Sequence, residues 1–374
     1  MRTHLYEYHQ KKGKIITFAG FDMPLCYEGI IPEHLSVRNS VGVFDVTHMG
    51  RCLIQGRNSV AFLNYLCTSE ISSMRVGKGR YSLMCNERGG IVDDIVIFRL
   101  KENQFIIIYN ATNRDKDFAW LNSNIRNFKV SLKEISNNTA MLALQGPNSL
   151  TTLQSIVDFD LSSLRYFWGR WVQIDGHKVF LTRTGYTGED GFELILWDVP
   201  LSESQKAQRL WENILAAGQS YGIKTCGLGA RDSLRLEAGF CLYGTDINEN
   251  ITPFEAALDF AVQLKKPSFM GKEALLKFST KNVKRVLVGI RSLGRVIPRS
   301  GNRVWSEEKD IGYLTSGTYS PLLRSGIGMG YVSNGCMQFG AQIIVKTEKS
   351  ATSAAISAMP FYDITVYGRK RLRY

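Results

Sequence analysis

The sequence predicts an α+β fold of two or three domains, and three observations lead to that prediction. The chain has 374 residues, more than a single hydrophobic core usually holds. Up to about residue 275, short apolar runs of strand type are joined by brief turns and separated by a few helical patterns. From residue 285 onward, short strands with frequent Gly and Ser predict a small antiparallel barrel or sandwich.

The elements are expected in the following order. Before residue 50 we expect strands at 14–19 and 41–46, with an irregular segment at Met23-Pro24. A helix capped by Asn58 or Ser59 follows. The next strands are expected at 80–86, 91–99, 104–110, 129–134, 139–145, 170–175, 178–184 and 192–196, and the next helices at 113–125, 148–156, 203–220 and 228–238. The polar stretch 279–284 lies in a predicted domain boundary, and the last strands are expected at 285–290, 303–305, 312–316, 328–332, 341–346 and 355–358.

Composition argues against several functional classes. No apolar run approaches the roughly 18 residues of a membrane span, and the N-terminus lacks the apolar block of a signal peptide, so a cytoplasmic protein is expected. The seven cysteines form no C-x-x-C pair and the five histidines no H-E-x-x-H motif, so we expect no metal site. There is no GxGxxG after a first strand and no P-loop, so nucleotide chemistry is not expected.

The net charge of +12 suits an acidic protein, a polyanionic small molecule or nucleic acid as partner. No zinc finger, RNP-type motif or basic recognition helix is present, so nucleic-acid binding is not expected. The one dense basic cluster, residues 369–373, is interpreted as a solvated tail.

Asp93 and Asp94 are unusual residues for the strand that follows the Gly89-Gly90 turn. Successive side chains of a strand point to opposite faces, and both faces become apolar directly after this pair. Burying a carboxylate without partners costs roughly several kcal/mol, so such a group is kept when it is hydrogen-bonded or has a task. Alternation cannot tell which aspartate is functional, and a structural, turn-capping role is the alternative.

Other polar residues in apolar surroundings suggest a ligand site. Glu193 follows a loop with three glycines and could accept two N–H donors from an aminopyrimidinone ring. Arg231, on the same helix face as Arg235, could pair with a ligand carbonyl or carboxylate. Asn110 lies at a strand end, and His48 is interpreted as structural rather than as a base. Together with stacking faces, these groups suggest a site for a planar anionic heterocycle, with ordinary core polar residues as the alternative; the tyrosines considered are Tyr81, Tyr109 and Tyr186.

Seven motifs along the chain together resemble one family. They are Phe18-Ala-Gly-Phe-Asp-Met-Pro24, Phe44-Asp-Val-Thr-His-Met49, Asn86-Glu-Arg-Gly-Gly-Ile-Val-Asp-Asp94, Leu144-Gln-Gly-Pro147, Gly185-Tyr-Thr-Gly-Glu-Asp-Gly-Phe-Glu193, Arg231-Asp-Ser-Leu-Arg-Leu-Glu-Ala-Gly-Phe-Cys-Leu-Tyr-Gly244 and Met359-Pro-Phe361. In this order they resemble the aminomethyltransferases, the T proteins of the glycine cleavage system. The resemblance runs nearly end to end, and Phe21 stands where the family more often has Trp.

The resemblance implies a three-domain cloverleaf of antiparallel sheets with helices and a small C-terminal β-barrel. Residues 1–275 would form the folate-binding region as two intertwined α+β domains, roughly 1–50 with 140–275, and 51–139. Residues 285–374 would form the barrel domain. Tetrahydrofolate, as co-substrate, would occupy the central opening. The implied reaction transfers an aminomethyl carbon from the lipoyl arm of H protein to tetrahydrofolate, which releases ammonia and forms 5,10-methylenetetrahydrofolate.

The resemblance also implies site residues. Asp94 would be catalytic, as a carboxylate held ionised by hydrogen bonds beside a folate amine. The implied folate-binding residues are Asn110, Glu193, Arg231, Tyr186, Met49, Tyr81, Tyr166 and Tyr367, of which Tyr367 departs by about one residue from the family spacing after Phe361. The alternatives are another folate-dependent one-carbon enzyme, such as a demethylase, or a non-enzymatic folate-binding protein.

Overall fold

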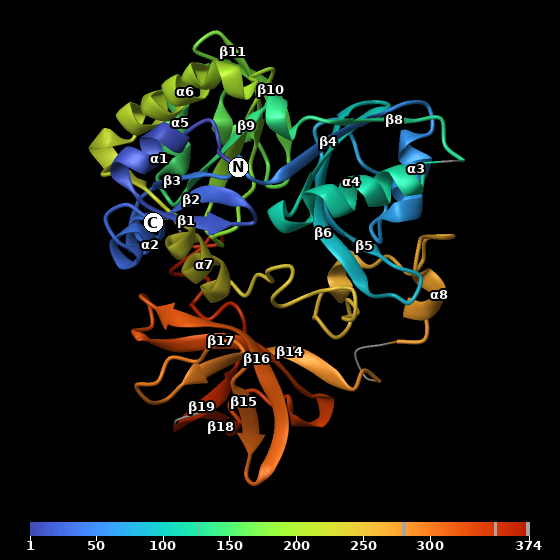
Figure 1. Ribbon diagram of the computed structural model, residues 1–374, viewed down its shortest axis with the longest axis vertical. Helices are drawn as coiled ribbons and strands as arrows, with labels where there is room; N and C mark the ends of the chain where they lie inside the picture. The colour runs from blue at the N-terminus through green and yellow to red at the C-terminus, as the bar shows by residue number, and fades with distance from the viewer. Residues whose placement is uncertain (126, 279–281, 348–349, 372–374) are drawn as a thin grey trace.

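Two sheets and one closed barrel form the framework of the chain, each in its own lobe (Figure 1). The computed structural model describes residues 1–125, 127–278, 282–347 and 350–371. Mixed helices and largely antiparallel sheets confirm the predicted α+β class. No helix within the described ranges is long and apolar enough to span a bilayer.

The first lobe contains a six-stranded sheet in the order β10-β11-β12-β9-β3-β13. Its neighbours pair antiparallel, except that β13 runs parallel to β3. Helices α5 and α6 supply apolar side chains to the core on one face of this sheet. A two-stranded hairpin (β1–β2) and two N-terminal helices complete the lobe. The bounds are α1 Tyr6–Lys12, β1 Lys14–Phe18, β2 Phe21–Cys26, α2 Ile30–Asn39, β3 Gly42–Asp45, β9 Ala140–Gln145, α5 Ser149–Gln154, β10 Gly169–Ile174, β11 His177–Thr182, β12 Gly191–Leu196, α6 Ser204–Ala217 and β13 Lys224–Thr225.

The second lobe is a five-stranded antiparallel sheet in the order β5-β6-β7-β4-β8. Apolar residues of α3 and α4 pack on one face of this sheet, and the opposite face packs against the six-stranded sheet. The two sheets therefore share one core. The bounds are β4 Gly50–Gln55, α3 Ser59–Leu66, β5 Gly79–Cys85, β6 Ile91–Lys101, β7 Gln104–Tyr109, α4 Arg114–Ser123 and β8 Ser131–Glu134.

The third lobe is a closed barrel in the order β14-β17-β16-β15-β18-β19, which decides between the predicted barrel and sandwich. Helix α7 lies between the six-stranded lobe and the barrel (Figure 1). The bounds are α7 Leu228–Glu237, α8 Lys272–Leu275, β14 Arg285–Ser292, β15 Arg303–Ser306, β16 Lys309–Ser320, β17 Ser325–Ser333, β18 Gln342–Lys346 and β19 Ala351–Ser357.

Several predicted details are wrong, each for a physical reason. Met23-Pro24 is not irregular but lies within β2, whose partner β1 leaves its other edge without a paired strand, where Pro is tolerated. Helix α2 was missed because it buries the polar residues Glu33, His34 and Arg38 beside Val37 rather than a continuous apolar stripe. Strand β4 was missed because a fully buried arginine, Arg51, interrupts its apolar pattern. Helix α1 and strand β13 were not predicted either.

The domain boundaries given above remain a proposal. The sheets support it, because β4 to β8 lie between residues 50 and 134 and the barrel begins at β14. The interpretation of 279–284 as a linker falls partly on residues 279–281, which lie outside the described residues.

Candidate active site

The two aspartates of β6 point to opposite faces with different surroundings. Ile95 and Ile97, on the face of Asp93, pack into the core under α3 and α4. Val96 and Phe98, on the face of Asp94, pack toward the six-stranded sheet. Asp94 therefore lies on the side where the two lobes meet.

Asp93 has a structural environment. Its side chain is fully buried, and its carboxylate accepts hydrogen bonds from the backbone N–H of Asn110 at 3.1 Å, from Asn110 Nδ2 at 2.9 Å and from Asn113 Nδ2 at 2.7 Å. These donors hold the end of β7 and the start of α4 against β6. Of the two aspartates, Asp93 is thus the one whose contacts fit a structural role rather than a catalytic one.

Asp94 has two hydrogen-bond donors and an unfavourable electrostatic environment. Asn110 Nδ2 donates to its Oδ1 at 2.7 Å, and Tyr81 donates to its Oδ2 at 3.1 Å. Burial, followed by the charge of Asp93, raises the pKa of Asp94 to about 7, although both donors lower it. The two donors favour the ionised form expected for Asp94, but burial and the charge of Asp93 oppose them and keep the pKa above its ordinary value.

The loop between β11 and β12 brings Tyr186 toward Asp94. The Tyr186 hydroxyl donates to the carbonyl of Cys241, and its ring stacks on Phe240 with centroids 5.7 Å apart. The Arg231 guanidinium carbon lies 4.7 Å from the centre of the Tyr186 ring. Burial and then the nearby charge of Asp94 raise the pKa of Tyr186, whereas Arg231 lowers it. Strand β6, the glycine-rich loop and α7 thus bring Asp94, Tyr186 and Arg231 together in one region, the candidate site.

Glu193 and Arg231 lie close enough in this region for their charges to interact. The Glu193 carboxylate accepts a hydrogen bond from Thr184, and burial raises its pKa while Thr184 and Arg231 oppose that shift. Burial lowers the pKa of Arg231, and the charges of Tyr186 and Glu193 oppose that shift. Within the described part of the chain, the Arg231 guanidinium makes no hydrogen bond or ion pair. A guanidinium carries five N–H donors, so this group is available to a ligand.

His48 and Met49 directly precede β4, and His48 lies close enough to Arg231 for their charges to interact. His48 is fully buried between the rings of Phe18 and Phe21, and its Nδ1 has no partner among the described residues. Burial and then the charge of Arg231 lower the pKa of His48 to about 3, so it is neutral and unsuited to act as a base. Met49 packs on the core shared by the two sheets.

The remaining tyrosines are placed less uniformly. Tyr166 lies under Arg369, whose guanidinium carbon is 4.0 Å from the ring centre. Burial and the charge of Glu193 raise the pKa of Tyr166, which indicates that Tyr166 lies near Glu193. Tyr367 instead contacts the ring of Tyr362 and the guanidinium of Arg371. Within the described residues it makes no hydrogen bond to Asp94 or Glu193.

Two interpretations of the sequence need correction here. Tyr109 offers no stacking face, because it is 1% exposed and its ring fills the space beside Gly50. The C-terminal tail is not simply solvated, because Arg371 pairs with the buried Glu189 and donates to the carbonyl of Arg38 at 3.0 Å. Of the basic cluster 369–373, positions 372 and 373 lie outside the described residues.

Arg231 and Arg235 share a helix but have different partners. Arg235 is buried and pairs with Asp246 at 2.6 Å and Asp232 at 2.8 Å. Arg235 is therefore structural, whereas the Arg231 guanidinium has no hydrogen bond or ion pair to any described residue.

Two residues near Asp94 were missed by sequence reasoning. Phe260 is 68% exposed and stacks on Tyr81 with ring centroids 5.9 Å apart. Asp117 is buried behind Asp93. The spacing of Asn113 and Asp117, one helical turn apart on a predicted helix, was a usable signal for a shared polar face.

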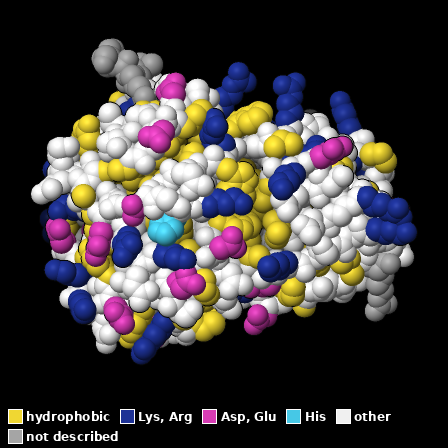
Figure 2. All heavy atoms as spheres, turned by 90° about the horizontal axis from the view of Figure 1, so that it is seen from above, with side chains coloured by type: hydrophobic (Ala, Val, Ile, Leu, Met, Phe, Trp, Pro, Cys, Tyr) yellow, Lys and Arg dark blue, Asp and Glu magenta, His cyan; other side chains and the backbone are white. Residues whose placement is uncertain are grey.

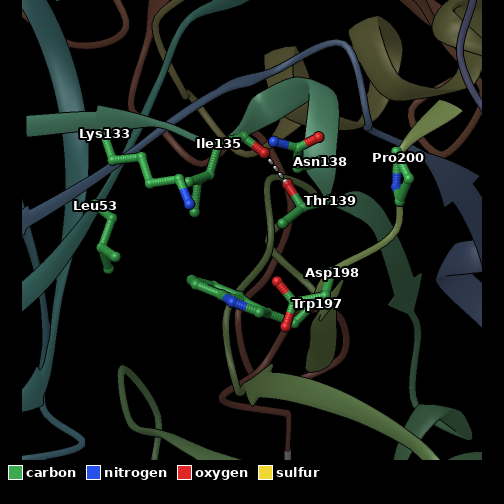
Figure 3. Close-up of a pocket in the computed structure, with 8 residues that line it drawn as sticks. All are labelled: Leu53, Lys133, Ile135, Asn138, Thr139, Trp197, Asp198 and Pro200. Carbon is green, nitrogen blue, oxygen red and sulfur yellow. Dashed lines mark hydrogen bonds between the residues drawn. The ribbon is translucent and has the colours of Figure 1, made fainter.

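A separate cavity of about 250 Å³ lies between the two sheets (Figure 3). Leu53 and Lys133 line it from the five-stranded lobe, and Trp197 and Asp198 from the six-stranded lobe. None of the predicted site residues lines this cavity. Among the described residues, no group of three or more His, Cys, Asp or Glu is arranged to hold a metal ion.

Comparison with known proteins gives matches over nearly the whole chain. Residues 5–266 match the family described as GCVT N-terminal domain, and residues 285–363 match the glycine cleavage T-protein C-terminal barrel domain. The chain is 43% identical to aminomethyltransferases of Desulfitobacterium hafniense and Thermotoga neapolitana, over 96% of this chain and 98% and 97% of those proteins. It is also similar to the crystal structure of glycine cleavage system aminomethyltransferase T from Bartonella henselae, with a TM-score of 0.89 and 36% identity over 97% of this chain and 98% of that chain.

Proposed function

This chain belongs to the glycine cleavage T-protein family and is an aminomethyltransferase, and we propose that its carbon donor is the lipoyl arm of H protein and its acceptor tetrahydrofolate. The products would be ammonia, dihydrolipoyl H protein and 5,10-methylenetetrahydrofolate. The observation that carries the folate part is the free Arg231 guanidinium opposite Glu193 and against Tyr186.

The residues that surround this place fit a reduced pterin. The Glu193 carboxylate can accept two parallel N–H bonds from an aminopyrimidinone, and Arg231 can donate to a carbonyl or carboxylate oxygen. Tyr186 offers an aromatic surface, and Tyr166, near Glu193, offers another. Met49, Tyr81, Asn110 and Tyr367 remain proposed folate-binding residues, of which Tyr367 also contacts Tyr362 and Arg371.

The reaction needs a group that can receive or stabilise protons beside the reacting nitrogens. The carbon forms two bonds to folate nitrogens, and its bonds to the lipoyl sulfur and to the amine nitrogen break. The two folate N–H protons are lost, and one finally resides on sulfur and the other on the departing ammonia. In its ionised form Asp94 would stabilise the positive charge that develops on the attacking nitrogen. Since both carriers are bulky, alignment should supply much of the rate.

An acidic carrier protein suits the surface charge of this chain. The formal net charge is +12, and Lys and Arg side chains are spread over the face shown in Figure 2. Hydrophobic side chains are visible on the same face between the first and second lobes. Exposed charges are screened by salt, so we expect the affinity for H protein to fall as ionic strength rises. The cytoplasmic location stays a prediction.

The function is tested by ammonia release. Purified protein is incubated with aminomethylated H protein and tetrahydrofolate, and ammonia and methylenetetrahydrofolate are measured. We expect ammonia and methylenetetrahydrofolate in equal amounts, with turnover dependent on both substrates. Formation of methyltetrahydrofolate without H protein would favour the demethylase alternative. Folate binding without any turnover would favour a non-enzymatic protein.

A further inference from the structure

Asp117 is a buried carboxyl group that the proposed mechanism leaves unexplained. It lies on α4, four residues after Asn113, and its side chain is fully buried. Neither of its carboxyl oxygens has a hydrogen-bond partner among the described residues. A buried carboxylate without a donor is costly, so a neutral acid is the form compatible with this position.

Asp93 is the neighbour that can accept a hydrogen bond from Asp117. Asp93 adjoins it, and an ionised carboxylate can only accept, so a bond between the two requires that one carboxyl group is protonated. Asp93 already accepts from Asn110 and Asn113, which is the pattern of an ionised group. The proton of the pair therefore belongs on Asp117.

Lys116 is a cation near Asp117 whose charge lowers the pKa of Asp117, but its hydrogen bonds within the described residues go to other groups. The ammonium group of Lys116 donates to the carbonyl of Val92 at 2.5 Å, to the Tyr243 hydroxyl at 2.8 Å and to Glu249 at 3.3 Å. The other titratable groups near Asp117 are Asp94, Tyr243 and Tyr109, none of which is a cation. Burial first, and then the hydrogen bond and the charge of Asp93, raise the pKa of Asp117.

We propose that Asp117 is a positioning residue, a neutral carboxylic acid that donates to Asp93 and so fixes the Asn110 amide against the catalytic carboxyl of Asp94. The chain of contacts runs from Asp117 on α4 to Asp93 at the start of β6, then through Asn110 to Asp94. The pair Asp93–Asp117 then carries one negative charge rather than two. This inference rests on the proposed role of Asp94 in the transfer reaction.

Two variants separate a neutral donor from a charged or merely space-filling group. Asp117→Asn keeps an N–H donor and a neutral group of the same shape, whereas Asp117→Ala removes the donor. We expect kcat of Asp117→Ala to fall about 10- to 100-fold with little change in the KM for folate, because a displaced Asn110 misaligns Asp94. Asp117→Asn should stay within about threefold of the unsubstituted enzyme. Equal loss in both variants would overturn the proposal.

The pH profile adds a readout that a packing defect would not move. If Asp117 is neutral, Asp117→Asn removes no charge, and the midpoint of the kcat/KM profile should stay in place. If Asp117 is ionised, the substitution removes a negative charge near Asp94, and the midpoint should fall by about half a pH unit or more. Such a fall would overturn the proposal.

Infrared difference spectroscopy tests the protonation state without any turnover. The spectrum of the unsubstituted protein minus that of Asp117→Asn at pH 7.5 should contain the carbonyl band of a protonated carboxylic acid. A carboxylate band in its place would overturn the proposal. Because this measurement needs neither H protein nor folate, its result is independent of whether the proposed function is correct.

Discussion

The side-chain nitrogen of Asn110 lies 2.7 Å from Oδ1 of Asp94 and 2.9 Å from Oδ1 of Asp93, so one amide joins two adjacent carboxyl groups on opposite faces of β6. The donor side of Asn110 is thus used within the protein. Its carbonyl oxygen is the atom that remains for a folate N–H. We therefore assign Asn110 a role in orienting Asp94, in addition to its proposed contact with folate.

Asp94→Asn should retain folate binding and lose turnover. The amide has nearly the same shape but cannot carry the negative charge, and removal of one such group typically lowers the rate by about 100- to 10,000-fold. Ammonia release and folate titration are measured on the same preparation. Asp115→Asn, at an exposed position of α4, is the matched control and should behave as the unsubstituted enzyme. Turnover of Asp94→Asn at the control level would refute the catalytic assignment.

The same substitution should stabilise the protein at alkaline pH. The folded-state pKa of Asp94, about 7, is raised above its ordinary value of 3.8, so between these values the unfolded chain has released a proton that the native state retains. Stability from this group therefore falls as pH rises toward 7. Asp94→Asn should raise the free energy of unfolding by roughly 4 kcal/mol at pH 8 and by roughly 1–2 kcal/mol at pH 5. Denaturant titrations at both pH values measure this, and equal effects at both would contradict it.

Activity should rise with pH through the ionisation of Asp94. We expect kcat/KM to increase between pH 6 and 8 with a midpoint near 7, because the carboxylate is the active form. Tyr81→Phe removes a donor to the carboxylate and should move the midpoint upward by about half a unit. Tyr221→Phe, at a partly exposed surface position, is the control. A profile that is flat or falls over this range would exclude Asp94 as the titrating group.

Much of the site region was predictable because it depends on local pattern. The Gly89-Gly90 turn and the apolar alternation after it predicted β6 correctly, and they marked its two aspartates as unusual. Alternation could not choose between Asp93 and Asp94, because both faces of the strand are buried. The choice depends on which face α4 covers and which face meets the other lobe, and both are tertiary facts.

Buried charges explain most of what the sequence pattern did not predict. Helix α2 and strand β4 lack an apolar stripe because Arg38 and Arg51 are buried within ion pairs or hydrogen bonds to carbonyl groups. Several of their partners come from distant segments, such as Glu237, which is 199 residues from Arg38, and Ser136, which is 85 residues from Arg51. The pattern of a single segment cannot contain such partners. Asp117 could not be predicted as a site residue for the same reason, because its neighbour Asp93 belongs to another element.

Arg231→Met should weaken folate binding without loss of stability. The guanidinium makes no hydrogen bond or ion pair in the described ranges, and its native contact is with the Tyr186 ring, 4.7 Å from its carbon, so its removal should cost little stability. A hydrogen bond to a charged group is worth about 1.5–3 kcal/mol, roughly 10- to 100-fold in affinity. The matched control on the same helix is Arg235→Met, which breaks a buried pair with Asp246 and should destabilise the fold by about 3–5 kcal/mol. Folate titration and thermal unfolding are measured on both variants. A destabilised Arg231→Met variant with normal folate affinity would make Arg231 structural.

Arg371→Ala should loosen the glycine-rich loop from its C-terminal side. Glu189 in that loop is buried, and it accepts from the Arg371 guanidinium and from the Gly368 backbone N–H at 3.0 Å, with Arg38 as its second cation at 3.1 Å. Because Arg38 remains, we expect a loss of only about 1–2 kcal/mol rather than the full cost of an unpaired buried charge. Glu193, four residues after Glu189, should then bind folate a fewfold more weakly. Lys370→Ala, the exposed neighbour, is the matched control in thermal unfolding and folate titration. If the two variants are indistinguishable, the contact between Arg371 and Glu189 does not support the loop, and the tail is solvated as its charge pattern alone predicts.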